Sequence, residues 1–451
     1  MSAGTAVAAA GAEGLPPGPK IGLFNIRSYV KDAPKFFEGC RAKYGDTFTL
    51  SLPLGKLVLT GSPEGVRQIY AAEASGLDVF APEFFSPFLN ETSLPVLGGA
   101  RHQRQRKLLS PPFHGARMKA YGRVMQDITL ERVRAWAPGS VVDLTELGHA
   151  VSLEVIIRTI FGVAEADRTA RFVAAVTEYT RAMRPVLIFF PPSRRGFGGL
   201  GPWAKYLRAK AAIEALIDEQ VGRYRRDRGR DADSVLRLLL DARDEDGQPM
   251  TDRQVRDEML TLLFGGQETT AISMAWVFHR LGRHPAVLER LRAEVRALGE
   301  LPEPSALASL PYLEAVCNEA LRLYPVASNV ARKLTRPLEL CGHEVPAGAG
   351  VGACVSLVHT NARLYPEPHE FRPERFLEKK FGPHEFMPFG GGVRRCIGAA
   401  FASYEMKIVV GTVVARCELA GAGGPPIPQV QQSFVLGPRD AVRLRYDGPA
   451  S

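Results

Sequence analysis

Near the C-terminus, one cysteine directly follows a glycine-rich and basic stretch. Cys396 comes after three consecutive glycines, Gly390 to Gly392, and after the pair Arg394 and Arg395. Consecutive glycines allow backbone angles that other residues avoid, and they let the backbone approach a neighbour closely. Apolar residues then recur at helical spacing. The pattern therefore predicts that the cysteine lies where a loop becomes the first turn of a helix.

This position favours an ionised thiol. Free N–H groups and the positive end of the helix dipole stabilise an anion at a helix N-terminus, and such a setting lowers the pKa of a cysteine. A thiolate of this kind is a nucleophile or a metal ligand. The alternative for a single cysteine is a small buried hydrophobic residue, so the rest of the chain must decide between the two.

A second polar group of residues interrupts an apolar segment. Residues 251–284 are predicted to form one long helix, which opens with a capping residue and is apolar nearly all round, as a buried helix is. Gly265 and Gly266 each cost about 1 kcal/mol relative to Ala, and Glu268 and Thr269 follow them. Such local inconsistency is typical of functional sites. A helix kink with satisfied polar side chains is the alternative.

Two further helices carry paired charges. His102 and Arg106 are four residues apart within the basic run 101–107, so they share one helix face. Glu319 and Arg322 are three residues apart and also face each other. Taken alone, both pairs are typical of solvated helix surfaces, where an ion pair contributes little.

The remaining pattern predicts many helices and a few strands. Periodic apolar positions predict helices over residues 63–72, 118–136, 144–161, 167–183, 203–226 and 234–242. Alternating segments predict hairpins over 47–60 and 338–351 and final strands over 433–438 and 442–446. The Pro- and Gly-rich break at 189–201 suits either a mobile lid or an ordinary connection.

Composition limits the class of protein. The chain has 451 residues, of which 45% are hydrophobic and 23% charged, as in a globular protein that can enclose a cofactor. Its six cysteines form no close pair, so neither a zinc site nor an iron–sulfur cluster is expected, and reduced thiols indicate a cytoplasmic location.

The N-terminal residues and the net charge further limit the class of protein. Residues 1–14 lack a basic region and an apolar run, so a disordered tail is expected rather than a signal peptide, with one domain from 15 to 451. No apolar run reaches about 18 residues, so no membrane anchor is expected. The formal charge of +9 indicates a solvated surface, and no motif for binding nucleic acid accompanies it.

Together these motifs resemble those of the cytochromes P450. The stretch Phe389-x-x-Gly392-x-Arg394-x-Cys396-x-Gly398 resembles the family's heme-thiolate signature. The sequence Gly-Gly-x-Glu-Thr-Thr at 265–270 resembles its oxygen-binding groove. The resemblance covers about residues 15–446 and implies a mainly α protein with a smaller β-rich lobe, in the α+β cytochrome P450 fold. The heme would lie between the long central helix and the loop and helix that carry the cysteine.

The resemblance also implies roles for individual residues. Cys396 would ligate the iron of heme b, Thr269 would hold dioxygen and an ordered water, and Glu268 would relay protons. The other heme-binding residues would be His102, Arg106, Arg332, Phe389, Arg394, Ile397 and Gly398. A buried structural network would comprise Glu319, Arg322 and Arg375. Substrate contacts would come from Phe84, Phe85, Phe88, Leu89, Gly265, Val326, Ala327, Phe434 and Val435.

The implied activity is insertion of one oxygen atom from O2 into a small apolar substrate, with fatty acids and terpenoids favoured. The heme domain occupies the whole chain, so a separate ferredoxin and ferredoxin reductase are expected to supply electrons. The basic residues Arg104, Lys107 and Arg395 would attract an acidic ferredoxin. The protein is expected to be a monomer.

Two other functions remain open. One is a peroxide-driven hydroxylase of the same fold, which would not need the pair Glu268 and Thr269. The other is a non-catalytic protein that binds heme or a ligand, which would need no proton delivery. Turnover with peroxide alone, compared with turnover with a redox pair, distinguishes the first; absence of oxidation across a broad apolar panel would favour the second.

Overall fold

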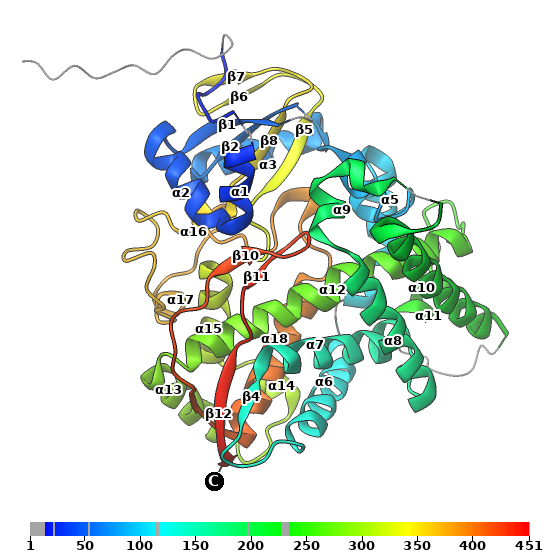
Figure 1. The fold of residues 1–451 in the computed structure, drawn as a ribbon, viewed down its shortest axis with the longest axis vertical. Coiled ribbons are helices and arrows are strands. Elements are labelled where there is room, and N and C mark those ends of the chain that lie inside the picture. The colour runs from blue at the N-terminus through cyan, green and yellow to red at the C-terminus, as the bar shows by residue number, and fades with distance from the viewer. Residues whose placement is uncertain are drawn as a thin grey trace, which may run out of the picture. The chain divides into compact units, whose positions relative to one another are not determined.

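The chain packs into two compact units in the computed structural model (Figure 1). The structure describes residues 14–20, 23–52, 55–113, 115, 117–195, 198–226 and 234–450. The first unit comprises Met1–Ala81, Ala327–His369 and Phe381–Arg395, and the second comprises Pro82–Val326, Glu370–Lys380 and Cys396–Ser451. The predicted tail lies outside the described residues except for Gly14, and the prediction of one domain over 15–451 stays a prediction.

The first unit is built on a five-stranded sheet with strand order β1-β2-β8-β5-β3. Its strands are β1 (Thr47–Leu52), β2 (Gly55–Thr60), β3 (Leu77–Val79), β5 (Val330–Leu334) and β8 (Gly350–Ala353). The predicted N-terminal hairpin is confirmed, since β1 and β2 pair antiparallel with Thr47 opposite Thr60. Adjacent residues of a strand point to opposite faces of the sheet, and both Val58 and Leu59 of β2 are fully buried, so β2 is covered on both faces there.

The second predicted hairpin is only half right. Strand β6 (Leu338–Leu340) pairs with β7 (His343–Val345), but β7 ends at Val345. The chain then turns through Gly348, whose φ of 86° suits glycine. The segment that follows is β8, which pairs with β2 and β5 instead. Pairing with a distant strand overrides the continuous apolar pattern.

Helix α3 in the first unit matters for the site. It runs over Pro63–Gly76, four residues longer than predicted, with the Ser62 hydroxyl accepting a hydrogen bond from the Gly65 N–H and Pro63 in the first turn. The other helical elements of this unit are α1 (Leu23–Lys31), α2 (Ala33–Tyr44), α16 (Val355–His359) and the 3-10 turn η5 (Gly392–Arg394).

The second unit is mostly helical. Its first helices are α4 (Pro82–Phe85), η1 (Leu94–Val96), α5 (Gly99–Leu109), η2 (Pro111–Phe113), α6 (Arg117–Val133), α7 (Leu144–Val155), η3 (Ile156–Ile160), α8 (Ala166–Ala182), α9 (Pro185–Phe189), η4 (Pro191–Arg194), α10 (Gly201–Arg226) and α11 (Val235–Asp241). They are followed by α12 (Asp252–Leu281), α13 (Pro285–Arg296), α14 (Pro304–Leu307), α15 (Pro311–Leu323), α17 (Arg375–Glu378) and α18 (Ala399–Arg416). The predicted helices between 118 and 242 are confirmed within a few residues at each end.

Helix α12 is the central element of this unit. It contacts α7, α10, α15 and α18, and its C-terminal half is buried on all sides, including Trp276 and Phe278. Thr251 and Gln254 cap its start reciprocally. The helix continues without interruption through Gly265 and Gly266, so their low helix propensity is overridden by packing on the neighbouring helices.

Two small sheets complete the second unit. β12 (Arg443–Pro449) lies between β4 (Val141–Asp143) and β9 (Cys417–Gly421), and β10 (Gln429–Gln431) pairs with β11 (Leu436–Pro438). The mainly helical chain with several small sheets confirms the predicted α+β class. None of the helices in the described part of the chain combines the length and apolar character needed to cross a membrane.

Three helices meet at a buried carboxyl group. Glu405 of α18 is 1% exposed, and its hydrogen bond comes from Ser152 of α7. The Ser152 hydroxyl also lies 3.5 Å from the carbonyl oxygen of Gly266 in α12. Burial disfavours the charged form of the carboxyl group and raises the pKa of Glu405 to about 8.

Glu405 should make the protein less stable as pH rises. Its pKa is raised in the folded state, so between the ordinary pKa near 4.5 and about 8 the folded state binds the proton more tightly than the unfolded state. The free energy of unfolding should therefore fall across this pH range, by the order of a few kcal/mol for this group. Glu405→Gln should remove this part of the slope, measured by chemical denaturation at successive pH values.

The matched control is Glu131→Gln, because Glu131 lies exposed on α6, which packs against α18. This variant should keep the wild-type pH slope. An equal slope in wild type and Glu405→Gln would contradict the raised pKa.

Candidate active site

The cysteine loop has the backbone that the sequence predicts. Gly390 and Gly392 have φ angles of 65° and 64°, in the region that favours glycine. Cys396 is exposed, Gly398 is the N-cap, and α18 begins at Ala399. The thiol therefore lies at the start of a long helix, where a thiolate ligand is favoured.

The polar residues of α12 have defined partners. The Thr269 hydroxyl donates a hydrogen bond to the carbonyl oxygen of Gly265 at 2.6 Å, which leaves its oxygen able to accept one. The Glu268 carboxyl accepts a bond from the Ser433 hydroxyl at 2.8 Å. Burial raises the pKa of Glu268, and the bond from Ser433 opposes this shift. Glu268 thus keeps a proton to higher pH than an exposed glutamate does.

Glu268 lies in the wall of a cavity of about 240 Å³. It is lined by side chains of α8, the residue after it, the start of α9, α12 and the chain between β10 and β11: Val176, Tyr179, Thr180, Met183, Pro185, Leu263, Phe264, Gln267, Glu268, Gln432 and Ser433. Most of this lining is apolar. Among the described lining residues, Glu268 is the one acid or base. A cavity with a few polar groups on an apolar wall is typical of a small-molecule site.

The predicted substrate residues form an aromatic cluster beside this wall. The ring of Phe434 lies 5.4 Å from that of Phe85, 5.1 Å from that of Phe88 and 5.4 Å from that of the cavity residue Phe264. Phe84 also contacts Phe434. The other predicted substrate residues of this unit are Leu89, Gly265, Val326 and Val435. Leu89 is buried, and the carbonyl oxygen of Val326 accepts a hydrogen bond from the Leu436 N–H. Ala327 belongs to the other unit.

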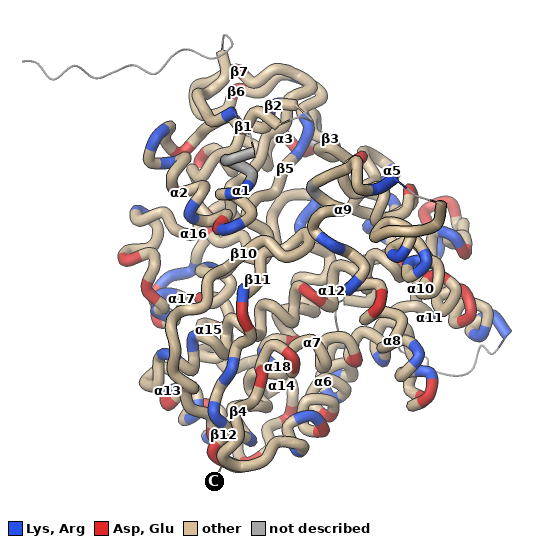
Figure 2. The backbone as a smooth tube through the Cα atoms, in the orientation of Figure 1, with Lys and Arg blue, Asp and Glu red and all other residues tan. Residues whose placement is uncertain are grey.

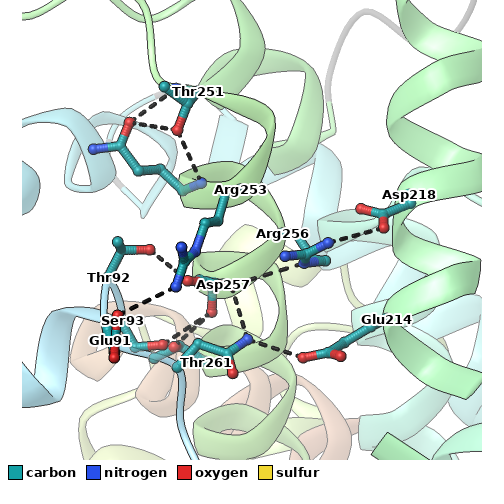
Figure 3. A network of polar contacts seen from close by, with 12 residues as sticks. Glu91, Thr92, Ser93, Glu214, Asp218, Thr251, Arg253, Arg256, Asp257 and Thr261 are labelled. Carbon is teal, nitrogen blue, oxygen red and sulfur yellow. Dashed lines mark hydrogen bonds and ion pairs between the residues drawn. The ribbon is translucent and has the colours of Figure 1, made fainter. Parts of the chain in front are cut away.

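Residues 90–94, which follow these phenylalanines, are hydrogen-bonded to two buried acidic side chains of α12. The carboxylate of Asp257 accepts bonds from Asn90 at 2.8 Å and from Thr92 at 2.5 Å, and Figure 3 shows Thr92 and Asp257 facing each other. The neighbouring Glu258 accepts a bond from the Leu94 N–H, and burial raises its pKa to about 8. These bonds fix the segment's position on α12.

The predicted heme-binding residues divide between the two units. The second unit holds His102, Arg106, Cys396, Ile397 and Gly398, and the first holds Arg332, Phe389 and Arg394. On α5, His102 is buried and Arg106 half-buried, one turn apart as predicted. Phe389, Ile397 and Gly398 are each half-buried.

Arg332 has a protein partner. Its Nε donates to the carboxylate of Glu73 at 2.9 Å, and a terminal nitrogen donates to the carbonyl oxygen of Ala331 at 3.0 Å. Its second terminal nitrogen is the group that could reach a heme propionate. Arg394 lies 4.0 Å from Asp78. The donor set still fits a dianionic heme, but Arg332 also has a task within the protein.

Glu319, Arg322 and Arg375 lie together, as the sequence predicts. Arg322 forms a two-pronged pair with Glu319, at 2.7 and 2.8 Å, and Arg375 donates to the same carboxylate at 3.0 Å. The N–H of Arg372 is a further donor to Glu319, at 2.9 Å. The side chains of Glu319 and Arg322 are fully buried. The network joins α15 to the segment that carries α17.

The basic residues expected to attract a ferredoxin already have acidic neighbours. Lys107 pairs with Glu245, and Arg104 lies 3.9 Å from Asp246. These pairs are exposed, and exposed pairs are weak. Figure 2 shows basic and acidic residues interspersed along the chain, for example on α10.

Two residues that contact predicted site residues had no predicted role of their own. Ser433 was predicted only as part of a strand, and Glu73 lies just beyond the predicted helix 63–72, in the part of α3 that the prediction left out. Neither belongs to a motif, and their partners lie 165 and 259 residues away in the chain. Only a folded structure reveals such contacts.

Comparison with known proteins identifies the family. The family model "Cytochrome P450" matches residues 14–442. "Putative cytochrome P450 135B1" of Mycobacterium tuberculosis is 31% identical over 454 residues, which cover 96% of this chain and 91% of that protein. "Putative cytochrome P450 138" of Mycobacterium bovis is 33% identical over 410 residues, or 89% of each chain. The chain therefore belongs to the cytochrome P450 family.

A solved structure supports the fold. The structure described as "Retinoic acid bound cyanobacterial CYP120A1" matches with a TM-score of 0.85 and 24% identity, covering 96% of this chain and 100% of that one. The predicted cytochrome P450 fold is confirmed. Membership of the family implies a heme b whose iron is ligated by a cysteine, and the chain is a heme-thiolate monooxygenase.

The Glu319 network should be essential for stability. Glu319→Ala would leave two buried guanidinium groups without their carboxylate, and removing one partner of a buried pair costs about 3–5 kcal/mol. We expect a loss of this size in the free energy of unfolding, together with a lower heme content. Urea denaturation of the purified protein and the ratio of heme to protein absorbance measure the two effects.

The matched control is Glu378→Gln, which breaks the exposed pair between Glu378 and the side chain of Arg372. It should cost less than about 1 kcal/mol. Similar losses in both variants would show that the buried network has no special role.

Proposed function

We propose that Cys396 is the iron ligand of this monooxygenase and that its substrates are neutral apolar molecules of the terpenoid kind. The overall reaction combines substrate, O2, two electrons and two protons to give a hydroxylated product and water. When bound, the heme supplies the reductive activation of O2. The residues of the chain must then position the substrate, exclude bulk water and deliver protons.

The lining of the cavity is the observation that carries the choice of substrate. It holds no Lys or Arg among its residues, while Glu268 contributes an acid. A carboxylate bound there would be desolvated without a cation to pair with, which is unfavourable. Fatty acids therefore fit less well than neutral molecules of similar size. The phenylalanine cluster around Phe434 supports an apolar guest.

Glu268 and Thr269 support the proton-delivery step. Burial raises the pKa of Glu268, so its carboxyl group keeps a proton to higher pH than an exposed glutamate does, and the bond from Ser433 holds that group in the cavity wall. The Thr269 hydroxyl, oriented by its bond to Gly265, can accept a hydrogen bond from a water molecule. This pair favours O2 rather than peroxide as the oxidant.

In this proposal the electrons come from a separate ferredoxin and its reductase, and the basic side chains of α5 would attract an acidic ferredoxin. An acidic ferredoxin would compete with Glu245 and Asp246 for the basic side chains of α5. Such exposed pairs exchange at little cost, so they do not block docking. The six cysteines, all among the described residues, form no disulfide bond with one another, which supports a reducing, cytoplasmic compartment.

Ligand titrations test the substrate class. The ferric protein should respond spectrally to neutral terpenoids, and a long-chain primary alcohol should bind at least about tenfold more tightly than the fatty acid of equal length, a difference of about 1.4 kcal/mol. The matched alcohol isolates the effect of the carboxylate. Equal or tighter binding of the acid would contradict a neutral-substrate site.

The same ligands then serve as substrates. Product should form with O2 and a reconstituted ferredoxin pair, and Thr269→Ala should consume electrons with little product. Comparable product with peroxide alone, in both wild type and variant, would instead favour the peroxide-driven alternative.

A further inference from the structure

The glycine-rich loop before Cys396 rests against two side chains of helix α3. Tyr70 and Glu73 are three residues apart, so they lie on one face of the helix. A Cβ atom added to Gly391 would lie 2.3 Å from the Tyr70 ring, and one added to Gly392 would lie 1.6 Å from Oε2 of Glu73. Both distances are far shorter than real contacts. The loop therefore needs glycine at these positions because α3 occupies the space.

Glu73 also bonds the backbone of this loop. Its Oε2 accepts a hydrogen bond from the Val393 N–H at 2.5 Å, and Val393 lies within η5, three residues before Cys396. Its Oε1 accepts the bond from Nε of Arg332 at 2.9 Å. The two side chains are only 2% and 10% exposed. A bond of this kind, between a backbone N–H and a charged carboxylate, is about twice as strong as a neutral one.

These contacts connect three distant parts of the first unit. Glu73 lies on α3, Arg332 on β5 and Val393 on the loop. Arg332 compensates the charge of Glu73, which would be costly to bury alone. Glycine has the largest conformational freedom, so a loop with glycine at 390–392 depends on contacts from neighbouring elements to keep one conformation. The carboxylate adds a hydrogen bond to the packing of Tyr70 against this loop.

We propose that Glu73, held by Arg332, is a positioning residue that fixes the loop presenting Cys396 to the heme iron. The proposal rests on the assignment of Cys396 as the iron ligand. It also gives Arg332 a task besides any contact with a heme propionate. Glu73 touches neither substrate nor iron in this account, and it acts only through the backbone of the loop.

Two substitutions separate the two parts of the restraint. Glu73→Gln keeps a carbonyl oxygen that can accept the Val393 N–H but loses the charge that pairs with Arg332. Glu73→Ala loses both. The matched control is Glu64→Gln, which removes the same charge from an exposed position on the same helix, where Glu64 pairs with Arg67.

The readouts are the fraction of reduced protein whose carbon-monoxide complex has the red-shifted thiolate band, and the rate of heme transfer from the ferric holoprotein to an excess of apomyoglobin. Hydrogen bonds to charged groups contribute about 1.5–3 kcal/mol. Glu73→Ala should therefore lose heme about ten- to a hundredfold faster and lose part of the thiolate band. Glu73→Gln should fall between it and wild type, and Glu64→Gln should match wild type.

Thermal unfolding of each variant is measured in parallel. A general loss of stability alone would lower the melting temperature without changing the thiolate fraction of the folded holoprotein. If Glu73→Ala fails to fold, the near-isosteric Glu73→Gln decides the question. A thiolate fraction and heme-transfer rate within twofold of Glu64→Gln, in whichever Glu73 variants fold, would overturn the proposal. Absence of the thiolate band in wild type would instead overturn the assignment of Cys396, and the role of Glu73 with it.

Discussion

A thiolate ligand depends on the backbone that carries it, and here that backbone contains three glycines in a row. Glycines have no side chains to pack, so neighbours must hold the loop in place. Tyr70 fills the space over Gly391, and the carboxylate of Glu73 bonds the loop directly. The covalent chain then carries this restraint to Cys396. The glycine-rich stretch that identifies the family is thus also held by residues that lie far away in the sequence.

Buried carboxyl groups have distinct tasks because their surroundings differ. Glu319 receives two guanidinium groups and a backbone N–H, so it serves as a charged structural anchor. Burial raises the pKa of both Glu268 and Glu405. In each case a hydrogen bond from one serine hydroxyl opposes this shift. The surroundings, rather than the residue type, therefore decide which buried glutamate pairs with guanidinium groups and which has a raised pKa.

Local patterns predicted much of this protein. The first hairpin, the helices between 118 and 242 and the long helix α12 depend on period, caps and turns within a short stretch of chain, so the sequence contains their signals. The network of Glu319, Arg322 and Arg375 was found through the family resemblance, since an isolated Glu-x-x-Arg pair would have indicated a surface.

The errors arise from long-range contacts. Residues 345–351 were joined into one strand because their apolar pattern is continuous, yet β8 pairs with β2 and β5. Glu73 lies beyond the predicted helix 63–72 and had no predicted role, because its partner Val393 lies 320 residues away. Arg332 fitted the family's propionate contact, and nothing near it in the sequence indicated an ion pair with Glu73.

The central claim is that Cys396 provides the thiolate. The most direct measurement is the absorbance of the reduced carbon-monoxide complex of Cys396→Ser, beside Cys341→Ser as a control on a second cysteine that forms no disulfide. The account predicts that Cys396→Ser loses the red-shifted thiolate band while Cys341→Ser retains it. A Cys396→Ser protein that binds heme and keeps the band would contradict the account.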